Sequence, residues 1–121
     1  MTRFALIAGA ALVLLAACAT TPETAMACDV TLKFGSYGMG IDRPLADSVD
    51  RAVKADRDIA HVERKPWGRE GEYDLCLTAR PGRDARAMFE RYKAILPARS
   101  LKAPTSITGP DGLSFETLAP M

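Results

Sequence analysis

Few of the side chains that carry enzyme chemistry occur in this sequence. It has one histidine, His61, and three cysteines. Any catalytic triad built on histidine has to use His61, yet neither a Gly-x-Ser-x-Gly motif nor the surroundings of a reactive cysteine accompany it. We therefore expect His61 to lie on the surface of a strand and the protein not to be an enzyme.

An excess of positive charge is also lacking. The formal net charge is +1, and Arg3 is the only charged residue among the first seventeen, so the rest carries fifteen basic and fifteen acidic residues. Proteins that bind nucleic acid usually show a strong basic excess that neutralises phosphates. This balance argues against nucleic acid as the partner.

No spacing of acidic residues matches a metal site. Asp56-Arg57-Asp58 lacks the glycine and the closing glutamate of a calcium loop. Basic residues alternate with the acidic ones between 42 and 58, which is typical of a solvated helix face. We expect neither a metal nor a cofactor.

The sequence has one long apolar run, Phe4 to Ala17, which is interrupted only by Gly9 and preceded by Arg3. Spanning a bilayer takes about 20 apolar residues, so this run is short for a transmembrane helix. A basic start followed by a short apolar run is typical of a secretory signal peptide. We predict a signal peptide over residues 1–17.

The run ends in Leu15-Ala16-Ala17-Cys18, which closely resembles the lipobox of bacterial lipoprotein precursors. The resemblance implies that the chain is cleaved before Cys18 and that Cys18 carries diacylglycerol and a further acyl chain. It also implies an envelope protein facing the periplasm, and Ala19 favours the outer membrane over the inner. Ala25-Met26-Ala27 before Cys28 is an alternative, ordinary signal-peptidase site.

Residues 18–27 have no apolar period and are predicted to tether the lipid to a single domain over residues 28–118.

If Cys18 is lipidated, Cys28 and Cys76 remain, and an oxidising compartment favours a disulfide between them. The alternative is a pair of buried thiols. Cys28 shares its face with Val30 and Leu32, whereas Cys76 lies opposite the apparent core residues of its strand. Either Cys28 precedes the strand or a bulge intervenes.

Apolar periodicity and turn residues predict the elements of the domain. Alternation predicts strands near 28–34, 61–65, 72–78, 105–108 and 113–116, and helical spacing predicts helices over about 43–56 and 85–95. Either Asp42 or Arg43 is expected to cap the first helix. This order suits an α+β fold, a ferredoxin-like βαββαβ sandwich with an extra C-terminal strand.

A glycine-rich stretch links the first strand to the first helix and contains Gly35, Ser36, Gly38 and Gly40. Backbone N–H groups before a helix N-terminus bind anions, so this loop is a candidate site for a small anionic ligand. It matches neither the dinucleotide fingerprint nor the P-loop. The alternative is a tight turn that needs glycine for positive φ.

Aromatic and basic residues coincide where a hairpin is predicted. Trp67, Arg69 and Tyr73 would form a contact patch at its tip, because tryptophan is favoured at interfaces. The alternative is a tryptophan that covers an edge of the core.

The sequence as a whole predicts a membrane-anchored envelope lipoprotein with a non-catalytic interaction or structural role, whose partner is another envelope protein or a polymer. The alternative is an anion-binding module.

Overall fold

The computed structural model describes residues 27–121. The predicted signal peptide, Cys18 and the tether up to residue 26 lie outside this range. The described chain forms two α-helices, five strands and one short 3₁₀ turn. In chain order they are β1 Val30–Phe34, α1 Arg43–Ala55, β2 Ile59–Pro66, β3 Tyr73–Ala79, α2 Ala85–Lys93, β4 Thr105–Thr108, η1 Pro110–Gly112 and β5 Ser114–Glu116.

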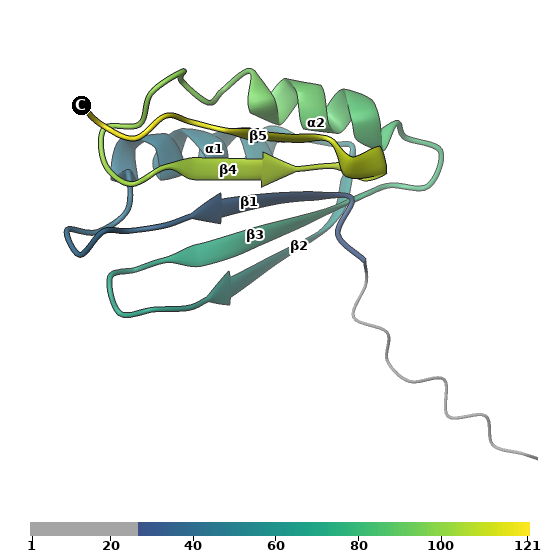
Figure 1. Ribbon diagram of the computed structural model, residues 1–121. Helices are drawn as coiled ribbons and strands as arrows, with labels where there is room; N and C mark the ends of the chain where they lie inside the picture. Colours follow the sequence, from purple (N-terminus) through teal and green to yellow (C-terminus); the bar gives the residue numbers. More distant parts are fainter. Residues whose placement is uncertain (1–26) are drawn as a thin grey trace, which may run out of the picture.

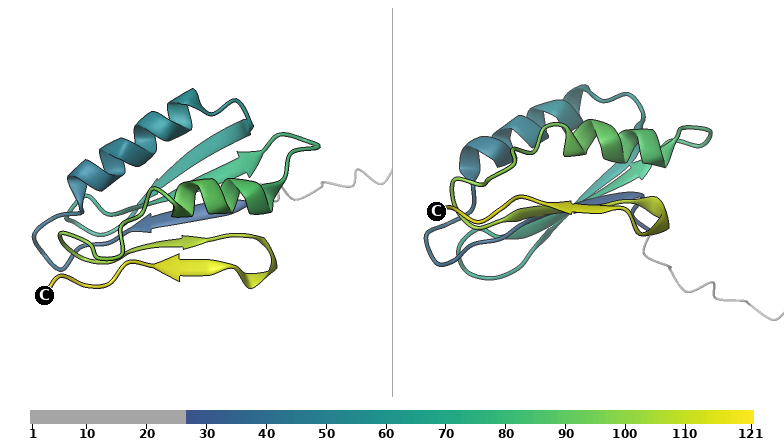
Figure 2. Two further views of the ribbon diagram at one scale, coloured as in Figure 1. Left: turned by 90° about the horizontal axis from the view of Figure 1, so that it is seen from above. Right: turned by 45° about the horizontal axis from the view of Figure 1, so that its top comes forward.

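The five strands form one antiparallel sheet in the order β2-β3-β1-β4-β5 (Figure 1). β1 lies in the middle, and its Leu32 is opposite Leu75 on one side and Ile107 on the other. Both helices lie on the same side of this sheet (Figure 2). The predicted α+β class is confirmed as a five-stranded antiparallel sheet with two helices.

Alternation of apolar residues decides which side of the sheet the helices cover. Val30, Leu32 and Phe34 of β1 are 1%, 0% and 0% exposed. They form one core with alternate residues of β3 and with the buried faces of the helices. Asp42, not Arg43, caps α1, because its side chain accepts a hydrogen bond from Leu45 N at 3.3 Å.

The opposite side of the sheet, which we call the open face, is polar. The core residues of each strand point toward the helices, so the residues between them point to the open face. These are mainly charged or hydroxyl side chains: Thr31, Lys33, His61, Glu63, Lys65, Asp74, Thr78, Ser106, Thr108, Ser114 and Glu116. His61 is exposed on β2, as expected.

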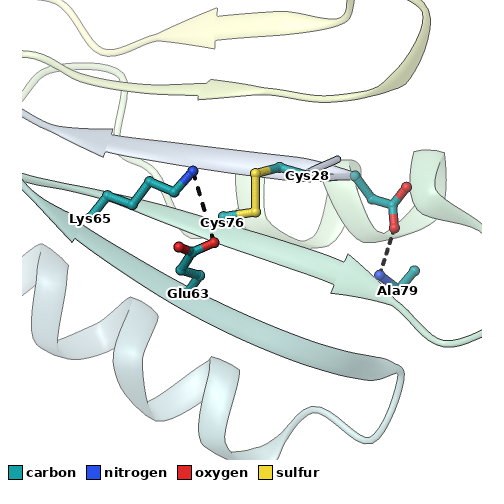
Figure 3. Close-up of a disulfide and its surroundings, with 6 residues drawn as sticks. Cys28, Glu63, Lys65, Cys76 and Ala79 are labelled. Atoms are coloured by element: carbon teal, nitrogen blue, oxygen red, sulfur yellow. Dashed lines mark hydrogen bonds and ion pairs between the residues drawn. A yellow bond between two sulfur atoms is a disulfide. The ribbon is translucent and has the colours of Figure 1, made fainter. Parts of the chain in front are cut away.

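The predicted disulfide joins Cys28 to Cys76 on this open face, with an S–S distance of 1.99 Å (Figure 3). Cys28 lies before the first residue of β1, so its side chain need not point to the same side of the sheet as Val30 and Leu32. This is the first of the two predicted explanations. Asp29 fixes the position: its N–H donates to the Leu77 carbonyl at 2.9 Å, and its carboxylate accepts from Ala79 N at 2.7 Å.

Replacing both Cys28 and Cys76 by alanine should lower the free energy of unfolding by about 4 kcal/mol. The bond closes a sequence separation of 48 residues, and the unfolded chain without it regains the corresponding entropy. Urea unfolding of the two proteins under non-reducing conditions measures the difference. A reductant should remove most of the difference, and equal stability of both proteins would contradict a structural role for the disulfide.

Candidate interaction surface

Four segments of the chain meet at one end of the sheet, which we call the distal end. They are the loop 35–42, the hairpin turn 67–72, the connection 97–104 and the tail 117–121, all at the left of Figure 1. Cys28 lies at the other end of the sheet, because β1 runs from it toward the distal end. The start of the domain and the distal end are therefore on opposite sides of the molecule.

A buried carboxylate connects two of these segments. Asp42 is 3% exposed. Besides capping α1, its carboxylate accepts hydrogen bonds from Leu101 N and from the Ser100 hydroxyl, each at 3.2 Å. Hydrogen bonds to a charged acceptor are stronger than those between neutral groups. Asp42 thereby fixes the connection 97–104 against the start of α1.

Further hydrogen bonds fasten the remaining parts of the distal end. Lys102 Nζ donates to the Met39 carbonyl at 2.9 Å, which links the connection 97–104 to the glycine-rich loop. In the tail, Leu118 O accepts from Ser100 N at 2.9 Å and Leu118 N donates to Ala98 O at 2.8 Å. The distal end is a scaffold held by backbone groups and buried side chains.

Large apolar side chains are exposed on this scaffold. Of the seven that are exposed among residues 27–121, six belong to the distal end, and only Val62 lies elsewhere. The six are Tyr37, Met39, Trp67, Leu101, Leu118 and Met121. Apolar side chains scattered singly are normal, but contiguous exposed groups mark interaction sites. Their concentration at one end is the main surface feature of the described chain.

Part of this group encloses a hollow of about 280 Å³, which we call the apolar patch. It is lined by Tyr37, Met39, Gly40, Leu101, Lys102, Ala103 and Pro120. Tyr37, Met39 and Leu101 are 73%, 84% and 74% exposed. The only charged residue in the lining is Lys102, whose ammonium group already donates to the Met39 carbonyl. The patch is suited to an apolar surface and not to a charged small molecule.

Trp67 also belongs to the distal end and lies on the open face. It is 43% exposed, and its indole Nε1 donates to Asp74 Oδ1 at 2.8 Å. The far edge of its ring lies close to Gly35, because a Cβ built on that glycine would be 4.0 Å from Trp67 Cη2. The ring therefore extends across β3 to the end of β1. A hollow of about 360 Å³ beside it is lined by Lys33, Lys65, Pro66, Trp67 and Asp74.

Tyr73 does not lie with Trp67, which corrects the predicted contact patch. It is 3% exposed and packs in the core at 4.9 Å from the Phe34 ring, beneath the Arg64 guanidinium. Burial, and then the nearby Asp50 carboxylate, raise the pKa of Tyr73. Tyr73 continues the alternation of the core residues Leu75 and Leu77, which places it on the helix side. Arg69 is exposed in the turn beyond Trp67.

The glycine-rich loop is organised around its own hydroxyl. Ser36 Oγ accepts hydrogen bonds from Gly38 N at 2.9 Å and Gly40 N at 3.0 Å, and both glycines have positive φ. The Asp42 carboxylate occupies the N-terminus of α1. Two of the N–H groups and the helix end that an anion would use are therefore already engaged. This geometry favours the tight-turn interpretation.

A second polar cluster joins the helices near the opposite end of the molecule. Asp56 follows α1 and accepts hydrogen bonds from the Tyr92 hydroxyl at 2.8 Å, from Arg91 at 3.1 Å and from Asp58 N at 2.9 Å. Partial burial acts to raise the pKa of Asp56, but these hydrogen bonds outweigh it and hold that pKa below its ordinary value. Burial and the hydrogen bond to Asp56 raise the pKa of Tyr92.

A hollow of about 430 Å³ beside this cluster is lined by Ala52, Ala55, Asp56, Arg57, Asp58, Arg91, Tyr92 and Ile95. Its charged groups are mostly paired with one another, since Arg91 bridges Asp56 and Asp58, and Arg83 contacts Asp58 at 3.3 Å. The cluster therefore serves to hold α2 against the end of α1.

Asp56→Asn should destabilise the fold by about 2 kcal/mol at pH 7, because a charged acceptor of three hydrogen bonds is lost. The pKa of Asp56 is lower in the folded protein than in the unfolded chain. The stability that its ionised carboxylate adds is therefore fully present above the ordinary pKa, and it is lost as the pH falls through the pKa of the folded state. The difference from the unsubstituted protein should shrink below about pH 4. Denaturant unfolding at a series of pH values measures it, and a difference that stays constant down to pH 2 would contradict the assignment.

Among the described residues, no group of three or more His, Cys, Asp or Glu side chains is placed to hold a metal ion. Within the same part of the chain, no helix is long and apolar enough to cross a bilayer. Comparison with protein-family models, with curated proteins and with solved structures finds no match.

Proposed function

We propose that this protein is a lipid-anchored lipoprotein of the bacterial envelope that binds another envelope protein through its distal end. The observation that carries the proposal is the position of the exposed apolar side chains, which gather at the end remote from Cys28. The core of a protein interface is depleted of charge and enriched in aromatic residues and methionine. Tyr37, Met39 and Leu101 have this character.

The anchor is inferred from the lipobox-like Leu15-Ala16-Ala17-Cys18. The Cys28–Cys76 disulfide supports a location outside the cytoplasm, because disulfides persist in oxidising compartments. With lipid on Cys18, residues 19–27 reach about 30 Å when extended. We place the protein in the periplasm. Because the residue after Cys18 is Ala19, we propose that the lipid is inserted in the outer membrane and not in the inner one.

The same arrangement gives the domain an orientation relative to the membrane. The tether enters beside Cys28, so the distal end can point away from the lipid toward a partner. In this orientation the apolar patch does not face the membrane and stays accessible to a partner. A protein partner fits better than a polysaccharide, because the lining of the patch offers few polar groups to bind hydroxyls.

We also infer that the domain is a ferredoxin-like βαββαβ sandwich extended by β5. The strand order supports this finer assignment: β2-β3-β1-β4 with two helices on one side is the arrangement expected for that unit, and β5 adds to β4 as a hairpin.

Photo-crosslinking in living cells tests the proposed binding surface. A photoreactive residue at Met39 or at Leu101, in the full chain with Cys18 intact, should capture the same envelope protein from both positions. The matched control is Arg86, which is exposed on α2 away from the distal end. Capture of that protein from Arg86 as efficiently as from Met39, or no capture from either patch position, would contradict the proposal.

Charge placed in the apolar patch should abolish this capture without unfolding the protein. Met39→Glu and Leu101→Glu each change an exposed side chain, so the free energy of unfolding should shift by no more than about 0.5 kcal/mol. Crosslinking from the neighbouring Tyr37 should nevertheless fall at least tenfold in each variant. Undiminished crosslinking from Tyr37 in both variants would show that the patch does not bind the partner.

A further inference from the structure

One edge of the sheet is free for pairing with another strand. β2 is the end strand, and Trp67 N donates to Glu72 O just beyond it. Hydrogen-bonded pairs alternate along an antiparallel ladder. The residues that bond to β3 are therefore Lys65 and Glu63, and the backbone N–H and C=O groups of Arg64 and Val62 point away from the sheet.

Two features limit the length of this free edge. Pro66 holds the next outward position and has no N–H to donate. At the other side, a register shift between Ile59 and His61 interrupts the ladder. The regular part of the free edge is therefore short and centred on Val62 to Arg64, so an incoming strand has few registers to choose from.

We propose that a second copy of this chain pairs with β2 in antiparallel orientation, with Val62 opposite Val62. In this register His61 of each copy faces Glu63 of the other on the open face, which gives two pairs with complementary polarity. Val62 then faces its own symmetry mate on the helix side. Opposite residues on one face of an antiparallel pair contact each other directly.

The neighbouring registers are less favourable. Moving the symmetry axis to residue 63 puts Glu63 opposite Glu63. Moving it to residue 64 puts Glu63 opposite Lys65, but it also puts Arg64 opposite Arg64 and Val62 opposite Pro66, which has no N–H for the ladder. Moving it to residue 61 puts His61 opposite itself and leaves Glu63 opposite Ile59. Like charges directly opposite each other disfavour the registers centred on residues 63 and 64. The register centred on residue 61 leaves Glu63 without a polar partner, so we propose the one centred on Val62.

A groove beside β2 gives this contact an apolar component. It has a volume of about 360 Å³ and is lined by Asp50, Val53, Lys54, Val62, Arg64 and Leu75. Val62 is 41% exposed and is, among residues 27–121, the one large apolar side chain that is exposed outside the distal end. The ion pair of Arg64 with Asp50, at 3.0 Å, lies at the side of this groove. A second Val62 would cover the apolar floor formed by Val53 and Val62.

The resulting assembly is closed. Both copies use the same edge, so the contact is a two-fold isologous interface that does not continue into a filament. The other edge strand, β5, has only three residues. The apolar patch takes no part, so the dimer goes beyond the proposed partner binding and can be tested separately from it.

Cysteine crosslinking tests the register. In the full chain with Cys18→Ser, purified in detergent, Val62→Cys supplies one thiol besides the native disulfide. Opposite Cα atoms of a hydrogen-bonded pair lie about 5.5 Å apart, within the span of a disulfide. Mild oxidation should convert most of this variant to a covalent dimer. In Arg64→Cys, the matched control, the two thiols would lie about 14 Å apart along the strands, so little dimer should form.

Charge exchange between positions 61 and 63 tests the pairing independently. His61→Glu and Glu63→Lys should each weaken the dimer at least tenfold in sedimentation equilibrium, because each places unfavourable groups opposite one another. The double variant restores a Glu–Lys pair and should regain the affinity. A strictly monomeric protein at high micromolar concentration, equal crosslinking at residues 62 and 64, or a double variant no stronger than the single ones would overturn the proposal.

Discussion

β1 is the strand on which the rest of the structure depends. It is paired on both sides, to β3 and to β4, and its inward residues are buried almost completely. The strand also runs from Cys28 at one end of the sheet to the distal end at the other. Asp29 and the disulfide fix its start, and its last residue leads directly into the loop that bears Tyr37 and Met39. The central strand thus sets the distance between Cys28 and the apolar patch.

The distal end shows how a buried polar group can organise an apolar surface. The carboxylate of Asp42 accepts from the backbone N–H of Leu101, and the ammonium group of Lys102 donates to the Met39 carbonyl. These bonds hold the backbone of the two segments without burying Tyr37, Met39 or Leu101. A backbone that is already ordered lowers the entropic cost of binding, although the side chains still have to be ordered.

Much of the fold could be predicted from the sequence, because alternation in strands such as Val30 to Phe34 is a local signal. The cap of the first helix was narrowed to Asp42 or Arg43, and the structure decides for Asp42. The disulfide followed from the cysteine count and the expected oxidising compartment. Tyr73 was misplaced although its alternation with Leu75 and Leu77 contained the answer. The apolar patch was missed for a different reason. Leu101 and Met39 lie in irregular segments, and only the tertiary hydrogen bonds of Asp42 and Lys102 bring them together. The glycine-rich loop was singled out for its backbone, whereas its side chains form the surface.

We propose that the start of the domain is held to lipid through Cys18, which leaves the distal end free to bind. The intact mass of the protein, extracted from its native membrane and alkylated before any reduction, tests this most directly. We expect a chain that begins at Cys18, carries acyl chains and has no alkylated thiol. A chain that begins at Cys28, or one that retains the apolar segment before Cys18, would contradict the proposed attachment and the orientation inferred from it.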